Sequence, residues 1–581
     1  MGWPGPERPW TSSVQCHMTL LRLYIRPTRR QRRPRRDFDQ NWRGWNPVDL
    51  TGNSIVAGRD VPGGGEAWRG TVAATGGPRG PLLRDASPET VAEAARQAAG
   101  AARAYRALPA HRRAAFLDAC ADGIEALGGA LLEVAASETG LPPERLAGER
   151  ARTCGQLRMF AALVRGGDAL GVRIDPALPE RLPLPRPDLR LRRVPVGPVA
   201  VFGAGNFPLA FSVAGGDTAS ALAAGCPVVA KAHPAHPGTC ELVARALTAA
   251  ADRSGMPAGV FSLLVGRGTG VGRALVRDPR IAAVGFTGSR AGGLALVGEA
   301  NARPVPIPVH AEMSAVNPVV VLDGALADPE PLAAAYAGSL TAGAGQFCTN
   351  PGLLLVPSGA AGDALRTAVA RAVSGIAGQV MLTPAIAEAR VAGAARWAAF
   401  DGVSVVAQGP PGAGPHAPGP VVLECDAATY ADHGELSEEV FGAVGLVVRW
   451  SGVPELLDLL DGLEGQLTAT VHGTEADLAT ARRLLPALEE RAGRVVWGGW
   501  PTGVEVCHAM VHGGPWPATS SPGTTSVGTL AVERWLRPVC YQSLPDALLP
   551  EELRAGNPLG VTRLVDGTLE PRPPHAAGRT A

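Results

Sequence analysis

The chain has 581 residues, a formal net charge of +1, 46% apolar residues and 18% charged residues. This length exceeds what one compact core supports, and the composition excludes a disordered chain, so we expect two or three packed domains. The basic residues are 53 arginines and one lysine, Lys231. Because arginine occupies every other basic position, the single lysine is a candidate for a chemical role.

Cysteine usage and hydropathy bear on location. The nine cysteines are odd in number and lack C-x-x-C pairs, which favours a reducing cytoplasm over a disulfide framework. The longest apolar stretch near the N-terminus, residues 18–25, is interrupted by Arg22 and is shorter than the roughly 20 residues that span a membrane. We therefore expect a cytoplasmic protein without membrane contact. No metal-ligand spacing is evident, so no metal is expected.

Both ends of the chain are predicted to be disordered tails. Residues 1–48 hold ten arginines against three acidic residues and show no hydrophobic period, which is typical of solvated segments. Two alternatives stay open for this tail: a misassigned start codon, with translation beginning near Val48, and a nucleic-acid-binding arm. The second predicted tail is 569–581.

The first folded region is predicted to be helical. Apolar residues recur at helical spacing over 88–132 and again over 143–163. Residues 171–193 then hold five prolines, which exclude a central strand or a long helix. We predict that residues 171–197 form an extended arm that reaches a neighbouring subunit.

Apolar strands alternate with glycine-rich turns and helices from residue 199 onward. This alternation is typical of doubly wound parallel sheets, so we predict an α/β fold with two such domains in sequence, joined near residues 308–313. The expected strands are 199–202, 228–232, 260–265, 282–286, 319–322, 353–356 and 445–448. The expected helices are 209–224, 239–254, 331–343, 363–376 and 475–488.

Two segments carry residues suited to covalent chemistry. Cys348 lies in the string GAGQFCTNPG, where glycines permit tight turns and expose backbone N–H groups beside a thiolate nucleophile. The alternative is a buried structural cysteine. Glu312 follows an apolar, proline-rich stretch at the predicted domain junction, where desolvation would raise its pKa toward the range of a general base. The alternative is an ordinary surface acid.

Two further polar residues follow predicted strands. Asn206 comes after strand 199–202 and two glycines, where its amide could donate to an oxyanion or cap a helix. Ser289 follows strand 282–286 and precedes a helix. The N–H groups of that helix could bind a phosphate, or the serine could simply cap a turn.

The order and spacing of these segments resemble the aldehyde dehydrogenase superfamily, from about residue 50 to about residue 567. Less general strings resemble the branch that contains α-ketoglutarate semialdehyde dehydrogenases and an NADP-preferring fatty aldehyde dehydrogenase. The general features are Asn206-Phe207-Pro208, Lys231, Phe286-Thr287-Gly288-Ser289, Gly345-Gln346-Phe347-Cys348 with Glu312 upstream, and Glu438-Glu439-Val440-Phe441-Gly442. The branch strings include Ala311-Glu312-Met313-Ser314, Gln346-Phe347-Cys348-Thr349-Asn350-Pro351-Gly352 and Ala509-Met510-Val511-His512-Gly513-Gly514-Pro515.

This resemblance implies a division of labour among three residues. Cys348 is expected to attack the aldehyde carbon, while Asn206 and the Cys348 N–H stabilise the oxyanion. Hydride then passes to the nicotinamide, and Glu312 activates the water that hydrolyses the remaining thioester. His508 or His512 is the alternative to Glu312 for proton transfer.

The resemblance also implies the cofactor contacts. His233 stands where NAD-preferring relatives often carry a ribose-binding glutamate, and Arg267 could pair with a 2′-phosphate, so we expect NADP, with NAD as the alternative. The implied contacts are Lys231, His233 and Arg267 around the adenosine ribose, Ser289 at the pyrophosphate, and Glu439 with Phe441 at the nicotinamide ribose.

The expected function is oxidation of α-ketoglutarate semialdehyde to α-ketoglutarate with NADP. Arg158, on the predicted helix 143–163, is either a clamp for the substrate carboxylate or a surface arginine. The alternatives for function are a broad aliphatic (fatty) aldehyde dehydrogenase and, more remotely, a nucleic-acid-associated protein acting through its tail.

A homodimer or homotetramer is expected. The implied domains are 49–170 with 198–312 for the cofactor, 171–197 as the oligomerisation arm, 313–500 for catalysis, and 501–568 as the C-terminal oligomerisation and closing segment.

Overall fold

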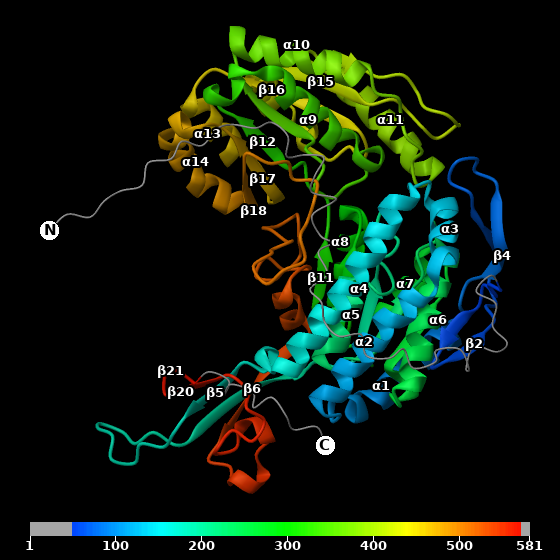
Figure 1. The fold of residues 1–581 in the computed structure, drawn as a ribbon, viewed down its shortest axis with the longest axis vertical. Coiled ribbons are helices and arrows are strands. Elements are labelled where there is room, and N and C mark those ends of the chain that lie inside the picture. The colour runs from blue at the N-terminus through cyan, green and yellow to red at the C-terminus, as the bar shows by residue number, and fades with distance from the viewer. Residues whose placement is uncertain (1–48, 571–581) are drawn as a thin grey trace, which may run out of the picture. The chain divides into compact units, whose positions relative to one another are not determined.

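The computed structural model describes residues 49–570, so the predicted tail 1–48 and most of the tail 569–581 lie outside the described residues. The chain divides into two units, Met1–Asp49 and Leu50–Ala581, and all helices and strands given below belong to the second. The fold is α/β, as predicted, and contains three sheets of five or more strands (Figure 1).

The first sheet has seven strands in the order β11-β10-β7-β8-β9-β1-β2. Strands β7 to β11 run parallel, whereas β1 and β2 add an antiparallel edge. All four residues of β7 are buried, as expected for a strand covered on both faces. The strands are β1 (Ser54–Val56), β2 (Arg59–Val61), β7 (Val199–Phe202), β8 (Val228–Lys231), β9 (Phe261–Leu264), β10 (Ala283–Thr287) and β11 (Val309–Glu312).

Helices cover both faces of this sheet. On one face, Ala94 of α1, Val271 of α7 and Leu296 of α8 share a buried cluster with the strands. On the other, α5 and α6 contact the strands, and α2, α3 and α4 pack over them. These helices are α1 (Pro88–Arg106), α2 (Ala110–Ala126), α3 (Gly128–Thr139), α4 (Pro143–Gly166), α5 (Gly216–Ala224), α6 (Pro237–Arg253), α7 (Thr269–Arg277) and α8 (Arg290–Asn301).

The second sheet also has seven strands, in the order β14-β15-β16-β13-β12-β17-β18. All neighbours are parallel except β14 with β15. One face buries Tyr336 and Leu365 from α9 and α10, and the other buries Trp397, Leu456 and Leu484 from α11, α13 and α14. The strands are β12 (Pro318–Val321), β13 (Leu353–Pro357), β14 (Ser404–Gln408), β15 (Val421–Asp426), β16 (Val444–Trp450), β17 (Gln466–His472) and β18 (Ala492–Trp497). The helices are α9 (Pro329–Thr341), α10 (Ala360–Ser374), α11 (Pro384–Ala398), α12 (Ala427–Asp432), α13 (Val453–Asp461) and α14 (Leu478–Arg491).

A five-stranded sheet, in the order β19-β6-β5-β20-β21, joins the proline-rich segment to the C-terminal part of the chain. Seven residues of β6 pair antiparallel with β19, and β5 pairs parallel with β20. The prolines lie between β5 and β6, in a loop that projects from the sheet (Figure 1). The strands are β5 (Val172–Asp175), β6 (Leu189–Pro195), β19 (Leu536–Gln542), β20 (Arg563–Val565) and β21 (Thr568–Glu570), and a separate hairpin contains β3 (Ala67–Thr71) and β4 (Pro78–Arg84).

Most predicted elements lie within three residues of the observed ones, but the helix predicted over 209–224 is wrong in its first half. α5 begins only at Gly216, and turns occupy the residues before it. The carboxylate of Glu149 in α4 accepts hydrogen bonds from the N–H groups of Leu209 (2.8 Å) and Ala210 (3.0 Å). A buried side chain from another helix therefore holds this segment in turns, which local sequence does not reveal.

The sequence analysis also omitted elements. Strands β14, β15, β17 and β18 had no predicted counterpart, and neither did the short strands before α1. In addition, β21 shows that the second predicted tail begins inside a strand. No helix in the described part of the chain is long and apolar enough to cross a membrane.

Candidate active site

Cys348 lies in the loop between α9 and β13, where the backbone takes an unusual path. Gly343, Ala344 and Gly345 have φ values of 56°, 61° and 72°, in the left-handed region that favours glycine. A Cβ atom on Gly345 would lie 2.2 Å from the backbone nitrogen of Ala443. Only glycine therefore permits this close approach, which fixes the loop that carries the thiol.

Asn317 fastens the same loop to the second sheet. Its side-chain nitrogen donates to the carbonyl oxygens of Cys348 (2.9 Å) and Asn350 (3.0 Å). Its side-chain oxygen accepts from the N–H of Thr468 in β17 at 3.2 Å. Because Asn317 is completely buried, these bonds are protected from water and hold the Cys348 backbone in place.

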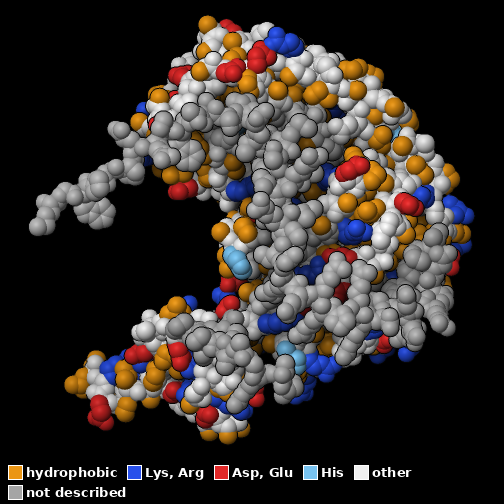
Figure 2. All heavy atoms as spheres, viewed as in Figure 1, with side chains coloured by type: hydrophobic (Ala, Val, Ile, Leu, Met, Phe, Trp, Pro, Cys, Tyr) orange, Lys and Arg blue, Asp and Glu red, His pale blue; other side chains and the backbone are white. Residues whose placement is uncertain are grey.

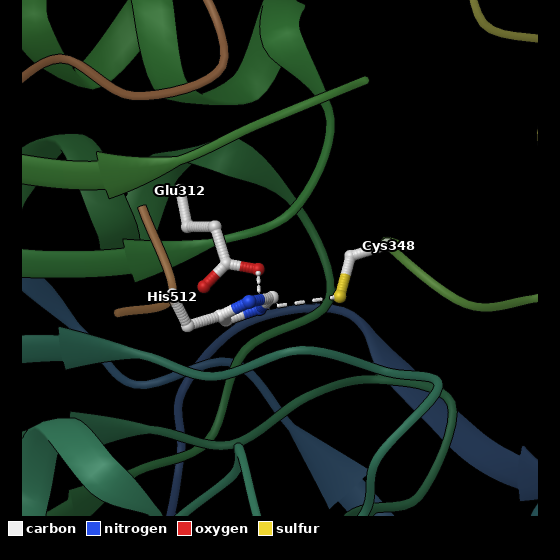
Figure 3. A group of neighbouring side chains, drawn as sticks. All are labelled: Glu312, Cys348 and His512. Carbon is white, nitrogen blue, oxygen red and sulfur yellow. Dashed lines mark hydrogen bonds and ion pairs between the residues drawn. The ribbon is translucent and has the colours of Figure 1, made fainter. Parts of the chain in front are cut away.

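His512 lies between Cys348 and Glu312 (Figure 3). Its Nε2 is 3.4 Å from Cys348 Sγ and 2.8 Å from Glu312 Oε1. The other oxygen of Glu312 accepts from the Ser526 hydroxyl at 2.8 Å, and the His512 N–H donates to Thr525 Oγ1 at 2.8 Å. The result is a cluster in which one imidazole nitrogen, Nε2, contacts both the thiol and the carboxylate; the Ser526 hydroxyl orients the carboxylate, and the Thr525 hydroxyl holds the His512 backbone.

The pKa values of Cys348 and Glu312 are shifted in opposite directions. Burial, followed by the negative charge of Glu312, raises the pKa of Cys348 well above its usual value. For Glu312, burial alone would raise the pKa. The interactions of its carboxylate with His512, Ser526 and Cys348 lower the pKa by more, so it lies below its usual value. The expectation of a raised carboxyl pKa at Glu312 is therefore wrong, because partners that the sequence does not reveal stabilise the ionised form.

Asn206 lies beside the cysteine loop. Its Nδ2 donates to the carbonyl oxygen of Gln346 at 2.8 Å, and the ring of the next residue, Phe207, packs edge-on against Phe347 at 5.2 Å. Helix α5 begins ten residues later, so Asn206 is not its cap. One N–H of the Asn206 amide remains for another acceptor, and the Cys348 N–H donates to none of the described residues.

The thiol, imidazole and carboxylate are also the side chains that zinc prefers. One ligand atom from each of Glu312, Cys348 and His512 lies within 4.8 Å of the others. These three residues are far apart in the chain and meet only in the fold, so the sequence shows no metal-ligand spacing.

Comparison with known proteins gives the family. The model of the "Aldehyde dehydrogenase family" matches residues 82–524. This chain belongs to the aldehyde dehydrogenase family. It is 54% identical over 525 residues to alpha-ketoglutaric semialdehyde dehydrogenase 2 of Azospirillum brasilense, covering 90% of this chain and 100% of that protein. It is 49% identical over 494 residues to alpha-ketoglutaric semialdehyde dehydrogenase of Acinetobacter baylyi, covering 85% of this chain and 94% of that protein.

A solved structure agrees in fold. The aldehyde dehydrogenase KauB from Pseudomonas aeruginosa superposes with a TM-score of 0.74 at 22% identity, covering 85% of this chain and 97% of that one. Members of the family use NAD or NADP, so this aldehyde dehydrogenase is an NAD(P)-dependent oxidoreductase.

The residues expected at the adenosine end of the cofactor lie at the carboxyl edge of the first sheet, where α/β sheets bind dinucleotides. Lys231 ends β8, and its ammonium donates only to the carbonyl oxygen of Ala232, at 3.2 Å. His233 stacks on His236 at 5.0 Å. Arg267 follows β9 with an exposed side chain that has no partner among residues 49–570. Two cations with spare donors suit a phosphorylated ribose.

The residues expected at the other end of the cofactor differ in their surroundings. Ser289 caps α8, since its hydroxyl accepts from the Gly292 N–H at 3.3 Å, and the Arg290 N–H donates to Ser314 Oγ at 3.4 Å, which leaves the Ala291 N–H of the first turn for an anion. Glu439 and Phe441 line a small cavity beside the cysteine loop. Burial raises the pKa of Glu439 to about 7, although a hydrogen bond from Ser314 and the charge of Arg290 oppose the shift.

Arg158 does not lie where a substrate clamp requires. Its guanidinium pairs with Asp122 (2.7 Å) and Glu125 (2.6 Å) of α2, and 40% of its side chain is exposed. It is nine residues from Glu149, half a turn out of phase on a helix of 3.6 residues per turn. Since Glu149 faces the Asn206 segment, Arg158 points the opposite way. The carboxylate-clamp prediction for Arg158 is therefore corrected, and the surface-arginine alternative holds.

Sequence reasoning placed two neighbours of the site poorly. The sequence indicates His512 only as an alternative to Glu312 for proton transfer, whereas the structure places it in contact with both Glu312 and Cys348. His508, the other histidine considered for that role, instead has its Nδ1 3.3 Å from Thr529 Oγ1. Arg152, which influences the pKa of Cys348, was not considered. Its position one helical turn after Glu149 could have indicated a shared face.

Proposed function

We propose that this aldehyde dehydrogenase oxidises α-ketoglutarate semialdehyde to α-ketoglutarate with NADP, through a covalent bond to Cys348. The observation that carries the proposal is the contiguous chain from Cys348 Sγ through His512 to Glu312 in a protein 54% identical to a dehydrogenase named for that semialdehyde. The broad aliphatic aldehyde dehydrogenase is the second candidate, because apolar side chains surround the thiol, as described below.

The chemistry begins with removal of the thiol proton. Burial and the nearby carboxylate keep Cys348 protonated at rest, so a base must act. His512 Nε2, 3.4 Å from the sulfur, can take the proton when the neutral imidazole carries its own proton on Nδ1, and the Nε2–H group so formed lies 2.8 Å from Glu312 Oε1, whose negative charge stabilises the imidazolium. The thiolate then attacks the aldehyde carbon.

Two donors support the oxyanion formed by that attack. The free N–H of the Asn206 amide and the N–H of Cys348 lie on neighbouring segments and have no other acceptor to satisfy among the described residues. Donors of this kind contribute about 3 to 4 kcal/mol each in well-studied acyl-transfer sites. Bound NAD(P) supplies the acceptor for the hydride that leaves the aldehyde carbon.

Hydrolysis of the thioester needs a base for water. Glu312 is ionised at neutral pH because its partners hold its pKa low, and it shares the buried pocket with His512. Because His512 still carries the thiol proton at this stage, Glu312 is the group that can accept the proton of the attacking water; the acid product then leaves, Cys348 recovers its proton from His512, and Glu312 releases its proton to solvent.

NADP, with NAD as an alternative, is the cofactor that the cationic edge supports. Lys231 and Arg267 supply positive charge where an adenosine ribose would lie, and they would attract a 2′-phosphate. His233, at the end of the same strand, presents no carboxylate to repel it.

We also propose a homodimer or homotetramer assembled through the five-stranded sheet. Strand β19 is at its edge, with one side free of partners within unit 2. The loop between β5 and β6 exposes Leu182 (89%) and Leu184 (70%), and Figure 2 shows hydrophobic side chains interspersed with charged ones on this arm. Exposed leucines beside an unpaired edge are features that a partner subunit would cover.

One assay tests the proposed function. Formation of NADPH and NADH is followed at 340 nm with α-ketoglutarate semialdehyde, pentanal and hexanal, using Cys348→Ser as the inactive control. We expect kcat/KM to be highest for the acidic semialdehyde with NADP. Higher kcat/KM for the neutral aldehydes would favour the aliphatic alternative, and no reduction of either cofactor with any aldehyde would contradict the proposal.

A further inference from the structure

One face of α4 is directed at the candidate active site. Arg145, Glu149, Arg152 and Gln156 recur at intervals of three or four residues, so they lie on one side of the helix. Arg145 lies over the rings of both Phe207 (4.6 Å) and Phe347 (4.7 Å). This face therefore contacts both the Asn206 segment and the Cys348 loop.

Arg152 has no hydrogen-bond partner among the described residues, and the side-chain nitrogen of Gln156, one turn later, also has none. Its guanidinium lies over the Phe211 ring at 5.0 Å, and its Nη2 is buried without an acceptor. The other buried arginine nitrogens without a partner, among the residues that the structure describes, are all Nε atoms. Arg152 is thus the one described arginine with a buried, unpaired terminal nitrogen, the atom that binds carboxylates.

The surroundings of Arg152 place it beside the reacting groups. Its positive charge lowers the pKa of Cys348, against the effect of burial. Burial lowers the pKa of Arg152 itself, and the nearby groups that oppose this shift are, in order of effect, Glu149, Cys348, Glu505 and Glu312. The ring under its guanidinium, Phe211, is 5.8 Å from the ring of His512.

The wall around this cation is otherwise apolar. One cluster packs side chains from the Asn206 segment, the cysteine loop and the C-terminal segment against one another. Its members are Ala204, Phe207, Ala210, Phe211, Phe347, Val504, Val506, Met510 and Val527. Within this largely apolar wall, the unpaired Nη2 of Arg152 gives an anionic group a positional preference, although the carboxylates of Glu149 and Glu505 also interact with its charge.

Other cations near the thiol are already engaged. Arg494, which also interacts with Cys348, donates from both terminal nitrogens to the carbonyl oxygens of Pro501 and Gly503, each at 2.6 Å. Arg145 is held between two phenylalanine rings and lies 3.7 Å from Glu149. Arg494 therefore has acceptors and Arg145 is held in place, whereas Arg152 interacts with Glu149 through charge and leaves its Nη2 without an acceptor.

We propose that the guanidinium of Arg152 binds the carboxylate of the substrate, at the end of the molecule away from the aldehyde. This assignment rests on the proposed function, in which the substrate is a short aldehyde with a carboxylate. Binding would supply the missing acceptor to Arg152 and direct the aldehyde carbon toward Cys348. Arg152 is therefore a specificity residue for ω-carboxylated aldehydes, and an uncharged aldehyde would leave it unpaired.

The test compares an acidic and a neutral substrate of the same length. Initial rates with α-ketoglutarate semialdehyde and pentanal are measured for the wild type, Arg152→Gln, Arg152→Lys and the matched control Arg158→Gln, which changes a partly exposed arginine about 120° away around α4. We expect the ratio of kcat/KM, acid over neutral, to fall about 30-fold or more in Arg152→Gln and less in Arg152→Lys. The control should keep the wild-type ratio.

The outcomes separate the two proposals. A wild-type enzyme that oxidises pentanal as well as the acid contradicts the proposed function, whatever the variants do. A wild type that prefers the acid, with an Arg152→Gln variant that keeps the same preference, contradicts only the Arg152 assignment.

A second measurement needs no turnover. Glutarate, a dicarboxylate without an aldehyde, should protect Cys348 from iodoacetamide, and the half-protecting concentration should rise about tenfold or more in Arg152→Gln. The alkylation rate without glutarate and the melting temperature show whether the variant is folded. Equal protection of a folded variant and the wild type would overturn the assignment.

Discussion

At the scale of single residues, the thiol of Cys348 is an unusual nucleophile because its environment opposes ionisation. Burial and a neighbouring carboxylate both disfavour the thiolate. The same carboxylate, however, lies 2.8 Å from the imidazole nitrogen that contacts the sulfur. Glu312 therefore hinders an isolated thiolate but stabilises a thiolate and imidazolium formed together, which links nucleophile activation to proton transfer within one buried group.

This arrangement predicts a strong effect of His512→Gln. The amide keeps much of the volume of the ring but cannot accept the thiol proton, so we expect kcat/KM to fall about 100-fold or more. The rate of Cys348 alkylation by iodoacetamide at neutral pH should fall with it. The matched control is His508→Gln, whose imidazole contacts Thr529 instead, and it should react at the wild-type rate. Wild-type alkylation in His512→Gln would exclude a role for that imidazole in activating the thiol.

Glu439 makes stability depend on pH in a predictable direction. Burial raises its pKa from 4.5 to about 7, so the folded protein holds this proton more tightly than the unfolded chain does. Between these pH values the free energy of unfolding therefore decreases as pH rises, and above about pH 7 the cost of the buried charge is complete.

Replacing Glu439 by Gln should remove this dependence. Relative to the wild type without cofactor, Glu439→Gln should gain nothing at pH 4.5 and about 2 kcal/mol at pH 8, a value discounted for the partial exposure of the side chain. Urea unfolding at both pH values measures the difference. Parallel pH dependences of the two proteins would show that Glu439 is not protonated in the folded state.

At the scale of elements, α4 holds the segment that carries Asn206, the proposed oxyanion donor. Glu149 accepts from the N–H groups of Leu209 and Ala210, in the turns that follow Asn206, and it is buried. Arg145 reaches the carbonyl oxygen of Asn206 itself at 3.4 Å. One helix thus determines the path of a segment that sequence reasoning assigned to a helix of its own.

Glu149 is therefore expected to act on catalysis only through Asn206. Glu149→Ala should lower the free energy of unfolding by about 1 to 3 kcal/mol, because two buried N–H groups lose their acceptor, and it should also lower kcat. In the double variant Glu149→Ala/Asn206→Ala, kcat should be no lower than in Asn206→Ala alone. Multiplicative effects of the two changes on kcat would mean that Glu149 acts independently of Asn206.

The elements that sequence predicted well are those governed by local pattern. Strand β7 was predicted at its observed bounds because four consecutive apolar residues between turn residues are all buried. The start of α5 is predicted too early, because in the segment before it the Glu149 carboxylate accepts from N–H groups that would otherwise donate to helical carbonyl oxygens. Likewise, Cys348 and Glu312 stand in recognisable strings, whereas the different orientations of Arg152 and Arg158 follow from the packing of α4 on its neighbours.

At the scale of the whole described molecule, the candidate active site combines three parts of the chain. β11 ends the first sheet at Glu312, the loop before β13 brings Cys348 from the second sheet, and the segment after β18 supplies His512. A bridge between Glu312 and Thr519 joins the first part to the last. The proposed cofactor contacts on the first sheet and the proposed nucleophile on the second therefore meet where the C-terminal segment lies against both.

The composition of the whole chain gives a further prediction, about Lys231. A chain with 53 arginines has its one lysine at the cofactor edge of the first sheet, where burial lowers the pKa of the ammonium. Lys231→Arg keeps the positive charge but replaces a compact ammonium by a larger, planar guanidinium. The Kd for NADPH, measured from the fluorescence of the cofactor, should therefore rise about tenfold, and the melting temperature should not change. The control Arg112→Lys alters an exposed cation that bonds only Ser254 and should bind NADPH like the wild type. Unchanged affinity in Lys231→Arg would mean that the lone lysine is a coincidence of composition.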